Sequence, residues 1–293
     1  MTERAPELWV GCPMWANRDW IGRWFPRDTP TGDELEVYAT WCNAVEGNTT
    51  FYAVPDATVI RRWADLAPPG FRFVFKLPRT ITHDRRLRHA DHDLASFLER
   101  ITPLRTVCGP VSVQLPASFG PEDLDTLDGF CAGLSLDWTW AVEVRHAEFA
   151  AGGTAEHRLH DLLRRHGVDR IILDSRPLFA AAPVTPAERE AWDRKPRLAV
   201  RPVALGWEPV VRIIGNSDPH DTIARWEPWI PKVASWLAEG RHPTVFLHTP
   251  DNLLSPPLAR RFHADVAAAF TELTGRSIAA LPAPATADQP SLF

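Results

Sequence analysis

Short apolar runs alternate with longer amphipathic stretches along most of the chain. Eight of these runs are short and almost continuously apolar, which is typical of parallel strands covered on both faces. We predict strands at residues 8–12, 44–48, 71–76, 110–115, 139–145, 170–174, 209–214 and 244–248. The stretches between them show helical periodicity and carry helix-start and helix-stop residues. We predict helices at residues 33–42, 57–67, 91–104, 121–132, 155–166, 222–238 and 256–274.

This alternation predicts a (β/α)8 TIM barrel, a single domain over residues 1–275, with a doubly wound sheet as the alternative. Two segments interrupt it. Residues 176–208, between the sixth and seventh strands, are rich in Pro and Ala and contain one short helix near 186–193, which is typical of a lid or binding loop. Residues 276–293 are also rich in Pro and Ala and are predicted to form a flexible, disordered tail.

Charge and cysteine content narrow the class of protein. The 293 residues carry a formal charge of −5, so any binding to nucleic acid has to use a local basic patch. The four cysteines are scattered without a C-x-x-C pair, which suits a reducing compartment and predicts a cytoplasmic location. The first residues do not resemble a signal peptide, and no apolar stretch approaches the length of a membrane span, so we expect no membrane partner.

Polar side chains gather at the ends of the predicted strands. Glu46 and Asn48 share one face of the second strand, and Glu143 and Arg145 share one face of the fifth. The remaining members close strands that are otherwise apolar, or lie inside one: Lys76, Gln114, Asp174, His248 and Arg212. Barrel enzymes keep their catalytic groups at the carboxyl ends of the strands, so we interpret this ring as a catalytic and anion-binding site. The alternative is a set of internal ion pairs that only fixes strand register.

The residue types suggest a role for each member of the ring. Three carboxylates face three permanent cations, which makes the ring nearly self-neutralising. Arg145 and Arg212, with Lys76, form a fork suited to a phosphate or carboxylate. The predicted substrate-binding set is Asn48, Lys76, His83, Gln114, Arg145 and Arg212. The predicted catalytic set, which supplies a general acid and base, is Glu46, Glu143, Asp174 and His248.

A metal centre receives weaker support from the sequence. His83, His146 and His248 are candidate ligands, but neighbouring arginine and lysine side chains oppose a divalent ion. We therefore assign no cofactor and no metal ligands, and leave a divalent metal as an open alternative.

Several ordered blocks resemble one known family. They are Gly11-Cys-Pro-Met-Trp15, Val45-Glu-Gly-Asn-Thr-Thr-Phe-Tyr52, Phe73-Val-Phe-Lys76, Ile81-Thr-His83, Gln114-Leu-Pro116, Val142-Glu-Val-Arg-His146, Leu173-Asp-Ser-Arg-Pro177 and Phe246-Leu-His-Thr-Pro-Asp251. These blocks resemble the YecE-like family, also known as domain of unknown function 72. The resemblance implies a TIM barrel and no particular activity. The family's characteristic positions correspond here to Glu46, Asn48, Phe51, Lys76, His83, Gln114, Glu143, Arg145, Asp174 and Arg212.

The chain departs from that family at two places. Many relatives carry a His-Gly pair just after the seventh-strand arginine, where this chain has Ile214-Gly215. They also carry an Asn pair in the eighth strand, where this chain has His248-Thr249.

The last five residues, Gln289-Pro-Ser-Leu-Phe293, resemble the Q-x-x-L-F peptide that docks bacterial DNA-processing proteins onto the replication sliding clamp. Leu292 and Phe293 would act as apolar anchors and Gln289 as a polar locator. The alternative is that the terminal Leu-Phe pair packs on the barrel.

Three functions follow from these observations. The first is a hydrolase of phosphoester bonds, a DNA-linked phosphodiesterase or repair-type nuclease, recruited to the sliding clamp by its tail and contacting phosphates through Arg85, Arg86 and Arg88. The second is a metabolic enzyme that acts on a small phosphorylated or carboxylated substrate, with residues 176–208 as its lid. The third is a non-catalytic adaptor for nucleic acid or protein.

Overall fold

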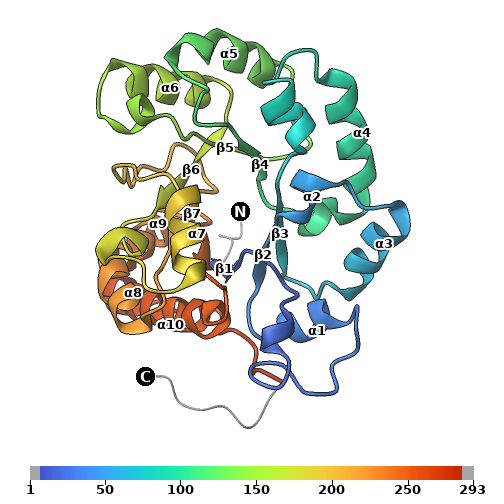
Figure 1. Ribbon diagram of the computed structural model, residues 1–293, viewed down its shortest axis with the longest axis vertical. Coiled ribbons are helices and arrows are strands. Elements are labelled where there is room, and N and C mark those ends of the chain that lie inside the picture. Colours follow the sequence, from blue (N-terminus) through green and yellow to red (C-terminus); the bar gives the residue numbers. More distant parts are fainter. Residues whose placement is uncertain (1–6, 286–293) are drawn as a thin grey trace.

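The computed structural model describes residues 7–285 (Figure 1). Within this range eight strands run parallel in one sheet of order β3-β2-β1-β8-β7-β6-β5-β4. Their bounds are β1 Trp9–Cys12, β2 Ala44–Gly47, β3 Arg72–Phe75, β4 Val111–Gln114, β5 Trp140–Glu143, β6 Asp169–Asp174, β7 Val210–Ile214 and β8 Thr244–His248. Parallel bridges from Phe73 to Cys108 and from Lys76 to Ser112 connect the two outer strands. The predicted TIM barrel is therefore confirmed, and the doubly wound alternative is excluded.

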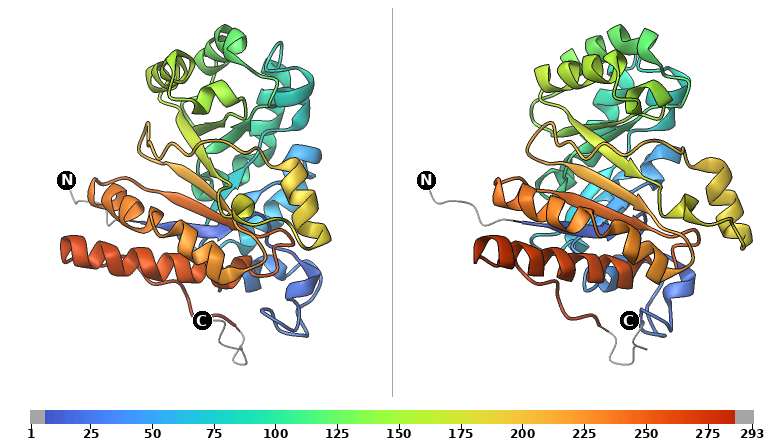
Figure 2. Two further views of the ribbon diagram at one scale, coloured as in Figure 1. Left: turned by 60° about the vertical axis from the view of Figure 1, so that its left-hand side comes forward. Right: turned by 90° about the vertical axis from the view of Figure 1, so that its left-hand side faces the viewer.

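Helices surround the barrel on its outside (Figure 2). The α-helices of residues 7–285 are α1 Glu34–Tyr38, α2 Thr49–Tyr52, α3 Ala57–Leu66, α4 Asp91–Ile101, α5 Leu124–Ala132, α6 Thr154–Arg165, α7 Pro186–Arg194, α8 Pro219–Trp226, α9 Trp229–Ala238 and α10 Ser255–Thr274. The helix predicted at residues 222–238 is two helices: α8 ends at Trp226 and α9 begins at Trp229, and Pro228 between them has no amide hydrogen to donate. The short α2 and a π-helical segment, Thr80–Asp84, come after β2 and β3 respectively and were not predicted.

The barrel interior changes from apolar to polar along the strands. One layer consists of apolar side chains: Trp9, Ala44, Val74, Ala141, Ile171, Val210 and Phe246. Side chains two residues apart point to the same face of a strand. Two residues further along, five of these strands carry Glu46, Lys76, Glu143, Arg212 and His248. The apolar layer thus closes the barrel from below, and the polar ring lies at the carboxyl ends of the strands.

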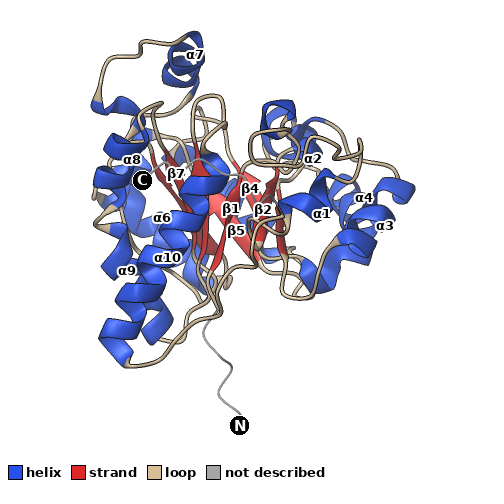
Figure 3. Ribbon diagram, turned by 90° about the horizontal axis from the view of Figure 1, so that it is seen from below, coloured by secondary structure: helices blue, strands red, loops and turns tan. Residues whose placement is uncertain are grey.

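The long connection between β6 and β7 lies at this end of the barrel. Its helix, α7, projects beyond the ends of the strands, apart from the outer ring of helices (Figure 3). Thr185 caps α7 and accepts a hydrogen bond from the amide of Glu188, and the Glu188 side chain accepts the Thr185 amide in return. The segment therefore contains a capped helix close to the one predicted at residues 186–193.

Residues 276–285 contain no helix or strand, as predicted, but they contact the barrel. Ile278 packs against the main apolar core, Arg260 donates a hydrogen bond to the Pro282 carbonyl at 2.8 Å, and the Ala285 amide donates one to Thr40 Oγ1. The predicted partner-binding residues Gln289, Leu292 and Phe293 lie outside the described residues. Among the helices of residues 7–285, none combines the length and the apolar character that crossing a membrane requires.

Candidate functional site

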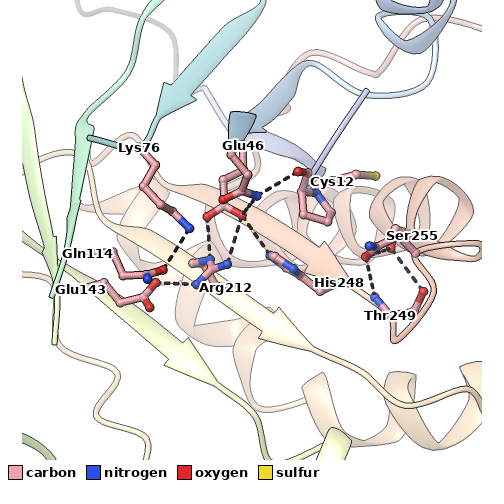
Figure 4. A network of polar contacts seen from close by, with 12 residues as sticks. Cys12, Glu46, Lys76, Gln114, Glu143, Arg212, His248, Thr249 and Ser255 are labelled. Carbon is pink, nitrogen blue, oxygen red and sulfur yellow. Dashed lines mark hydrogen bonds and ion pairs between the residues drawn. The ribbon is translucent and has the colours of Figure 1, made fainter. Parts of the chain in front are cut away.

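A cavity of about 610 Å³ opens at the carboxyl ends of the strands. Lys76, Gln114, Arg212 and His248 lie at its floor (Figure 4). Its remaining lining includes Asn48, Phe51, His83 and Arg145 from the segments that follow β2, β3 and β5, and Ala187, Ala191, Arg194 and Lys195 from α7 and the residue after it. A cavity of this size suits a small molecule.

Arg212 is the hub of the polar ring. Its Nε lies 2.7 Å from Oε1 of Glu46, and its Nη1 lies 2.5 Å from Oε2 of Glu143. A third contact joins Nη2 to Glu46 Oε2 at 3.2 Å. All three side chains are buried, so each charge depends on its partners for the solvation it has lost. The two carboxylates hold the guanidinium rigidly across the barrel.

Gln114 joins the two cations beside this hub. Its Oε1 accepts hydrogen bonds from Lys76 Nζ at 3.0 Å and from Arg145 Nη2 at 2.8 Å. Arg145 also donates from Nε to Glu143 Oε1 at 2.8 Å. Lys76 and Arg145 are therefore aligned side by side along one wall, with donors to spare for an anion in the cavity.

The electrostatics keep both carboxylates ionised. Burial alone would raise the pKa of Glu143 and of Glu46, but the positive charge of Arg212 leads the opposing effects, and each pKa lies below its usual value. Burial would lower the pKa of Arg212, but Glu143 and Glu46 outweigh it and raise that pKa. These three groups form a stable charged triad and are poor proton donors and acceptors near neutral pH.

His248 has the opposite character. Burial, and then the positive charges of Arg212 and Lys195, lower its pKa well below the usual value. The imidazole is therefore neutral at physiological pH. Its Nε2 lies 3.4 Å from Glu46 Oε2.

Two lysines of the cavity also have altered proton affinity. Burial lowers the pKa of Lys76 to about 8, although Glu46 opposes this effect. Burial, and then the like charges of Arg212 and Arg145, lower the pKa of Lys195 to about 7. Lys195 was missing from the predicted site because it lies in the long loop, where no strand periodicity places it. Its one signal in the sequence is rarity, since the chain contains only three lysines.

Asp174 does not join the ring that the sequence predicted for it. On β6 the inward positions are those of Ile171 and Leu173, so Asp174 points outward from the barrel. There it accepts hydrogen bonds from the Trp229 indole at 2.7 Å and from Arg176, whose Nη2 lies 2.6 Å away. The ring therefore contains two carboxylates, and the predicted self-neutralisation is wrong.

The other predicted binding residues lie at the cavity rim. Asn48 donates to the Pro13 carbonyl at 2.9 Å and to Glu46 Oε2 at 2.8 Å, which orients that carboxylate. His83 belongs to the π-helical segment, and its ring packs edge-on against Phe51 with centroids 5.0 Å apart. Burial, and then the charge of Arg79, lower the pKa of His83.

Arg85, Arg86 and Arg88 lie in the loop that follows β3, here called the third loop, and form ion pairs outside the cavity. Arg85 Nε lies 2.8 Å from Asp93 Oδ2, and Arg86 Nη2 lies 2.5 Å from Asp123 Oδ2. Arg88 contributes to the same cluster at 3.6 Å from Asp123 Oδ1. Each arginine thus already has a carboxylate partner, which weakens the prediction that they bind phosphates. Within residues 7–285, no three His, Cys, Asp or Glu side chains come together in a way that would hold a metal ion.

Comparison with known proteins identifies relatives over almost the full length. A family model described as "Protein of unknown function DUF72" matches residues 9–286. The UPF0759 protein YecE of Escherichia coli K12 is 37% identical over 286 residues, covering 98% of this chain and all of the relative. The corresponding protein of Escherichia coli O157:H7 matches with the same identity and coverage.

Among solved structures, a crystal structure of a DUF72 family protein from Enterococcus faecalis V583 superposes with a TM-score of 0.64 and covers 96% of this chain and 100% of that one. A second structure of the same protein gives a TM-score of 0.62 over 92% of this chain and 98% of that one. At 16% and 18% sequence identity these two likenesses concern the fold alone.

Proposed function

This chain belongs to the DUF72 family, whose description names no activity, and from its site we propose an enzyme that acts on a small phosphorylated or carboxylated molecule. The substrate binds in the cavity between the polar ring and α7. Its anionic group is recognised by Lys76, Arg145 and Lys195.

The observation that carries this proposal is an excess of positive charge. Four cations face the cavity or its floor, Lys76, Arg145, Lys195 and Arg212, against the two carboxylates of Glu46 and Glu143. The other charged groups at the rim are already paired. Arg194 lies 2.7 Å from Glu190, and Arg79 lies 3.2 Å from Asp84. An excess of two charges in a partly desolvated cavity matches a dianion such as a phosphate monoester.

The roles of the ring members follow from their contacts. Glu46 and Glu143 are ionised partners of Arg212 and fix the position of the ring. The neutral imidazole of His248 is the general acid–base group, and Glu46 orients it from 3.4 Å. Arg145 and Lys76, aligned by Gln114, present their remaining donors to the substrate anion. No step of this scheme runs through a metal ion.

The lid explains why a small molecule suits the site better than a polymer. α7 and the residue after it contribute Ala187, Ala191, Arg194 and Lys195 to the lining, so this segment forms one side of the cavity. The arginines expected to contact DNA are held by Asp93 and Asp123. We therefore place the small anionic substrate ahead of the DNA-linked phosphodiesterase.

Isothermal titration with inorganic phosphate tests the proposal. We expect one binding site per chain, and at least about tenfold weaker binding in Arg145→Met and in Lys195→Met, since each loses a charge-assisted contact. The matched controls are Arg225→Met, which loses an exposed ion pair on α8, and Lys232→Met on α9; both should bind as the wild type does. Equal affinity in all four variants, or no binding by the wild-type chain, would refute the site.

A further inference from the structure

Lysine is rare in this chain and concentrated in the cavity. The sequence contains 29 arginines and three lysines, Lys76, Lys195 and Lys232. Two of the three line the cavity. Arginine provides a permanent charge and a fixed fork of donors, whereas lysine can lose its proton and act as a nucleophile. In a chain that uses arginine almost everywhere else, lysine at these two positions points to chemistry that arginine cannot perform.

The backbone fixes where Lys195 stands. It ends α7 as its C-cap, and its amide donates to the Ala191 carbonyl at 2.9 Å. Pro196 follows, which restrains Lys195 to extended geometry, and the Pro196 carbonyl accepts a hydrogen bond from Ser175 Oγ at 2.7 Å. Ser175 comes directly after β6, so the lysine is tied to the barrel at the edge of the cavity.

The two cavity lysines differ in their partners. Lys76 Nζ donates to Gln114 Oε1 and lies 5.8 Å from the centroid of the Phe51 ring. The Lys195 side chain has no hydrogen-bond or ion-pair partner among residues 7–285, although it lines a cavity that holds Arg145, Arg212 and His248. Lys76 is thus held in place as a binding group, and Lys195 is the amine that remains available to a substrate.

The surroundings also favour the reactive form of this amine. Burial and the like charges of Arg212 and Arg145 outweigh the attraction of Glu46 and Glu143, and lower the pKa of Lys195 to about 7. About half of the amine is then neutral at pH 7, against roughly four parts in ten thousand for a solvent-exposed lysine. Lysines that form Schiff bases are activated by the same two effects, desolvation and a neighbouring cation.

We propose that Lys195 is the nucleophile of this site and forms an imine with the carbonyl carbon of an aldehyde or ketone that carries a phosphate or carboxylate group. This inference rests on the proposed function, in which Lys76, Arg145 and Lys195 recognise the anionic group; when Lys195 is the nucleophile, that group is held by Lys76 and Arg145. It adds the second half of the substrate, the carbonyl, and places it beside α7.

The step is balanced without an oxidant or a cofactor. The lone pair of the neutral amine attacks the carbonyl carbon, a C–N bond forms, and the carbonyl oxygen takes up a proton. The nitrogen then loses a proton to give the carbinolamine. Its hydroxyl takes up a proton and leaves as water while the C–O bond breaks, and the nitrogen lone pair completes the C=N bond of a protonated imine. His248, neutral and in the same cavity, is the group that transfers protons in both stages. Addition of water in reverse returns the amine.

Reductive trapping of the full chain tests this assignment. The protein is incubated at pH 7 with pyridoxal 5′-phosphate, an anionic aldehyde, reduced with borohydride, and mapped by mass spectrometry. Only three lysines and the terminal amine compete for the label, so the site of reaction can be read directly. We expect at least about tenfold more label on Lys195 than on Lys232. Excess inorganic phosphate should suppress the label on Lys195.

Lys195→Arg is the decisive variant, because it keeps the positive charge and removes the nucleophile. It should bind inorganic phosphate within about threefold of wild type and trap no label in the cavity, while Lys232→Arg should trap label as wild type does. If phosphate binds but the label falls equally on Lys195 and Lys232, or moves to Lys76, the nucleophile assignment is overturned and the anion site stands. If pyridoxal without its phosphate labels Lys195 equally well, the lysine is reactive but the anion site is refuted.

Discussion

Arg212 on β7 contacts Glu46 on β2 with its Nε 2.7 Å from Glu46 Oε1, across a sequence separation of 166 residues. The two strands are not neighbours in the sheet, since β1 and β8 lie between them. The ion pair therefore spans the barrel interior, and Glu143 on β5 completes it from another side at 2.5 Å. Arg212, Glu46 and Glu143 are therefore held by one another, and the other polar groups at the floor of the cavity can contact a ligand.

Removing Arg212 should destabilise the fold strongly. Arg212→Met leaves two buried carboxylates without their main partner, and breaking a buried ion pair in this way costs about 3–5 kcal/mol. Urea unfolding at pH 7 should show that loss. Adding Glu46→Gln and Glu143→Gln to the same chain should recover more than half of it, because the uncompensated charges are gone. Arg225→Met, which removes an exposed pair on α8, should change stability by less than about 0.5 kcal/mol.

Lys195 should make stability depend on pH in a direction that its pKa determines. The folded-state pKa of about 7 is lower than that of an unfolded lysine, about 10.4, so between these values the unfolded chain binds more protons. The penalty for charging Lys195 is complete below pH 7 and fades as pH rises towards 10. The free energy of unfolding of wild type, relative to that of Lys195→Met, should therefore rise by at most about 1.4 kcal/mol per pH unit in that window. A stability difference that stays constant from pH 6 to 9.5 would contradict the shift.

Anion binding should weaken as pH rises. Sulfate keeps its double charge throughout the neutral range, so any change in affinity reports the protein. Protonated Lys195 and Lys76 attract it, and their pKa values of about 7 and about 8 mean that both charges are lost between pH 6 and 9. Calorimetry should show affinity falling at least about tenfold over that range, with a shallower decline in Lys195→Arg. Affinity that is flat or rising with pH would exclude these lysines as the anion ligands.

Asp174 should matter for stability and leave ligand binding unchanged. Asp174→Asn weakens the contacts with Arg176 and the Trp229 indole, and a buried charged hydrogen-bonding group is worth about 1.5–3 kcal/mol. We expect a stability loss of that order by urea unfolding, with sulfate affinity within about twofold of wild type. A variant that keeps full stability but no longer binds sulfate would restore Asp174 to the site.

The barrel and most of the polar ring could be predicted from the sequence because the strands are short apolar runs and most of them carry a polar residue at or near the carboxyl end. The runs at residues 44–48 and 244–248, for example, contain Glu46 and His248 at positions that do point inward. The prediction that Asp174 points inward was wrong because Ile171, Ile172 and Leu173 are all apolar. The sequence of β6 therefore does not distinguish its inward face from its outward one.

The remaining differences arise outside the strands, where periodicity gives no information. Lys195 owes its position to the end of α7 and to Pro196, within a long loop. The pairing of Arg85 and Arg86 with carboxylates depends on how α4 and α5 pack beside the third loop. Such contacts are tertiary, and a local pattern cannot report them.

The most direct measurement is a crystal structure of the full chain soaked in tungstate, whose metal gives an unambiguous anomalous signal. We predict one strong peak in the cavity under α7, within hydrogen-bonding distance of Arg145, Lys76 and Lys195, and loss of that peak in Lys195→Met crystals. An empty cavity at saturating tungstate, with peaks only on the outer surface, would contradict the anion site and with it the proposed class of substrate.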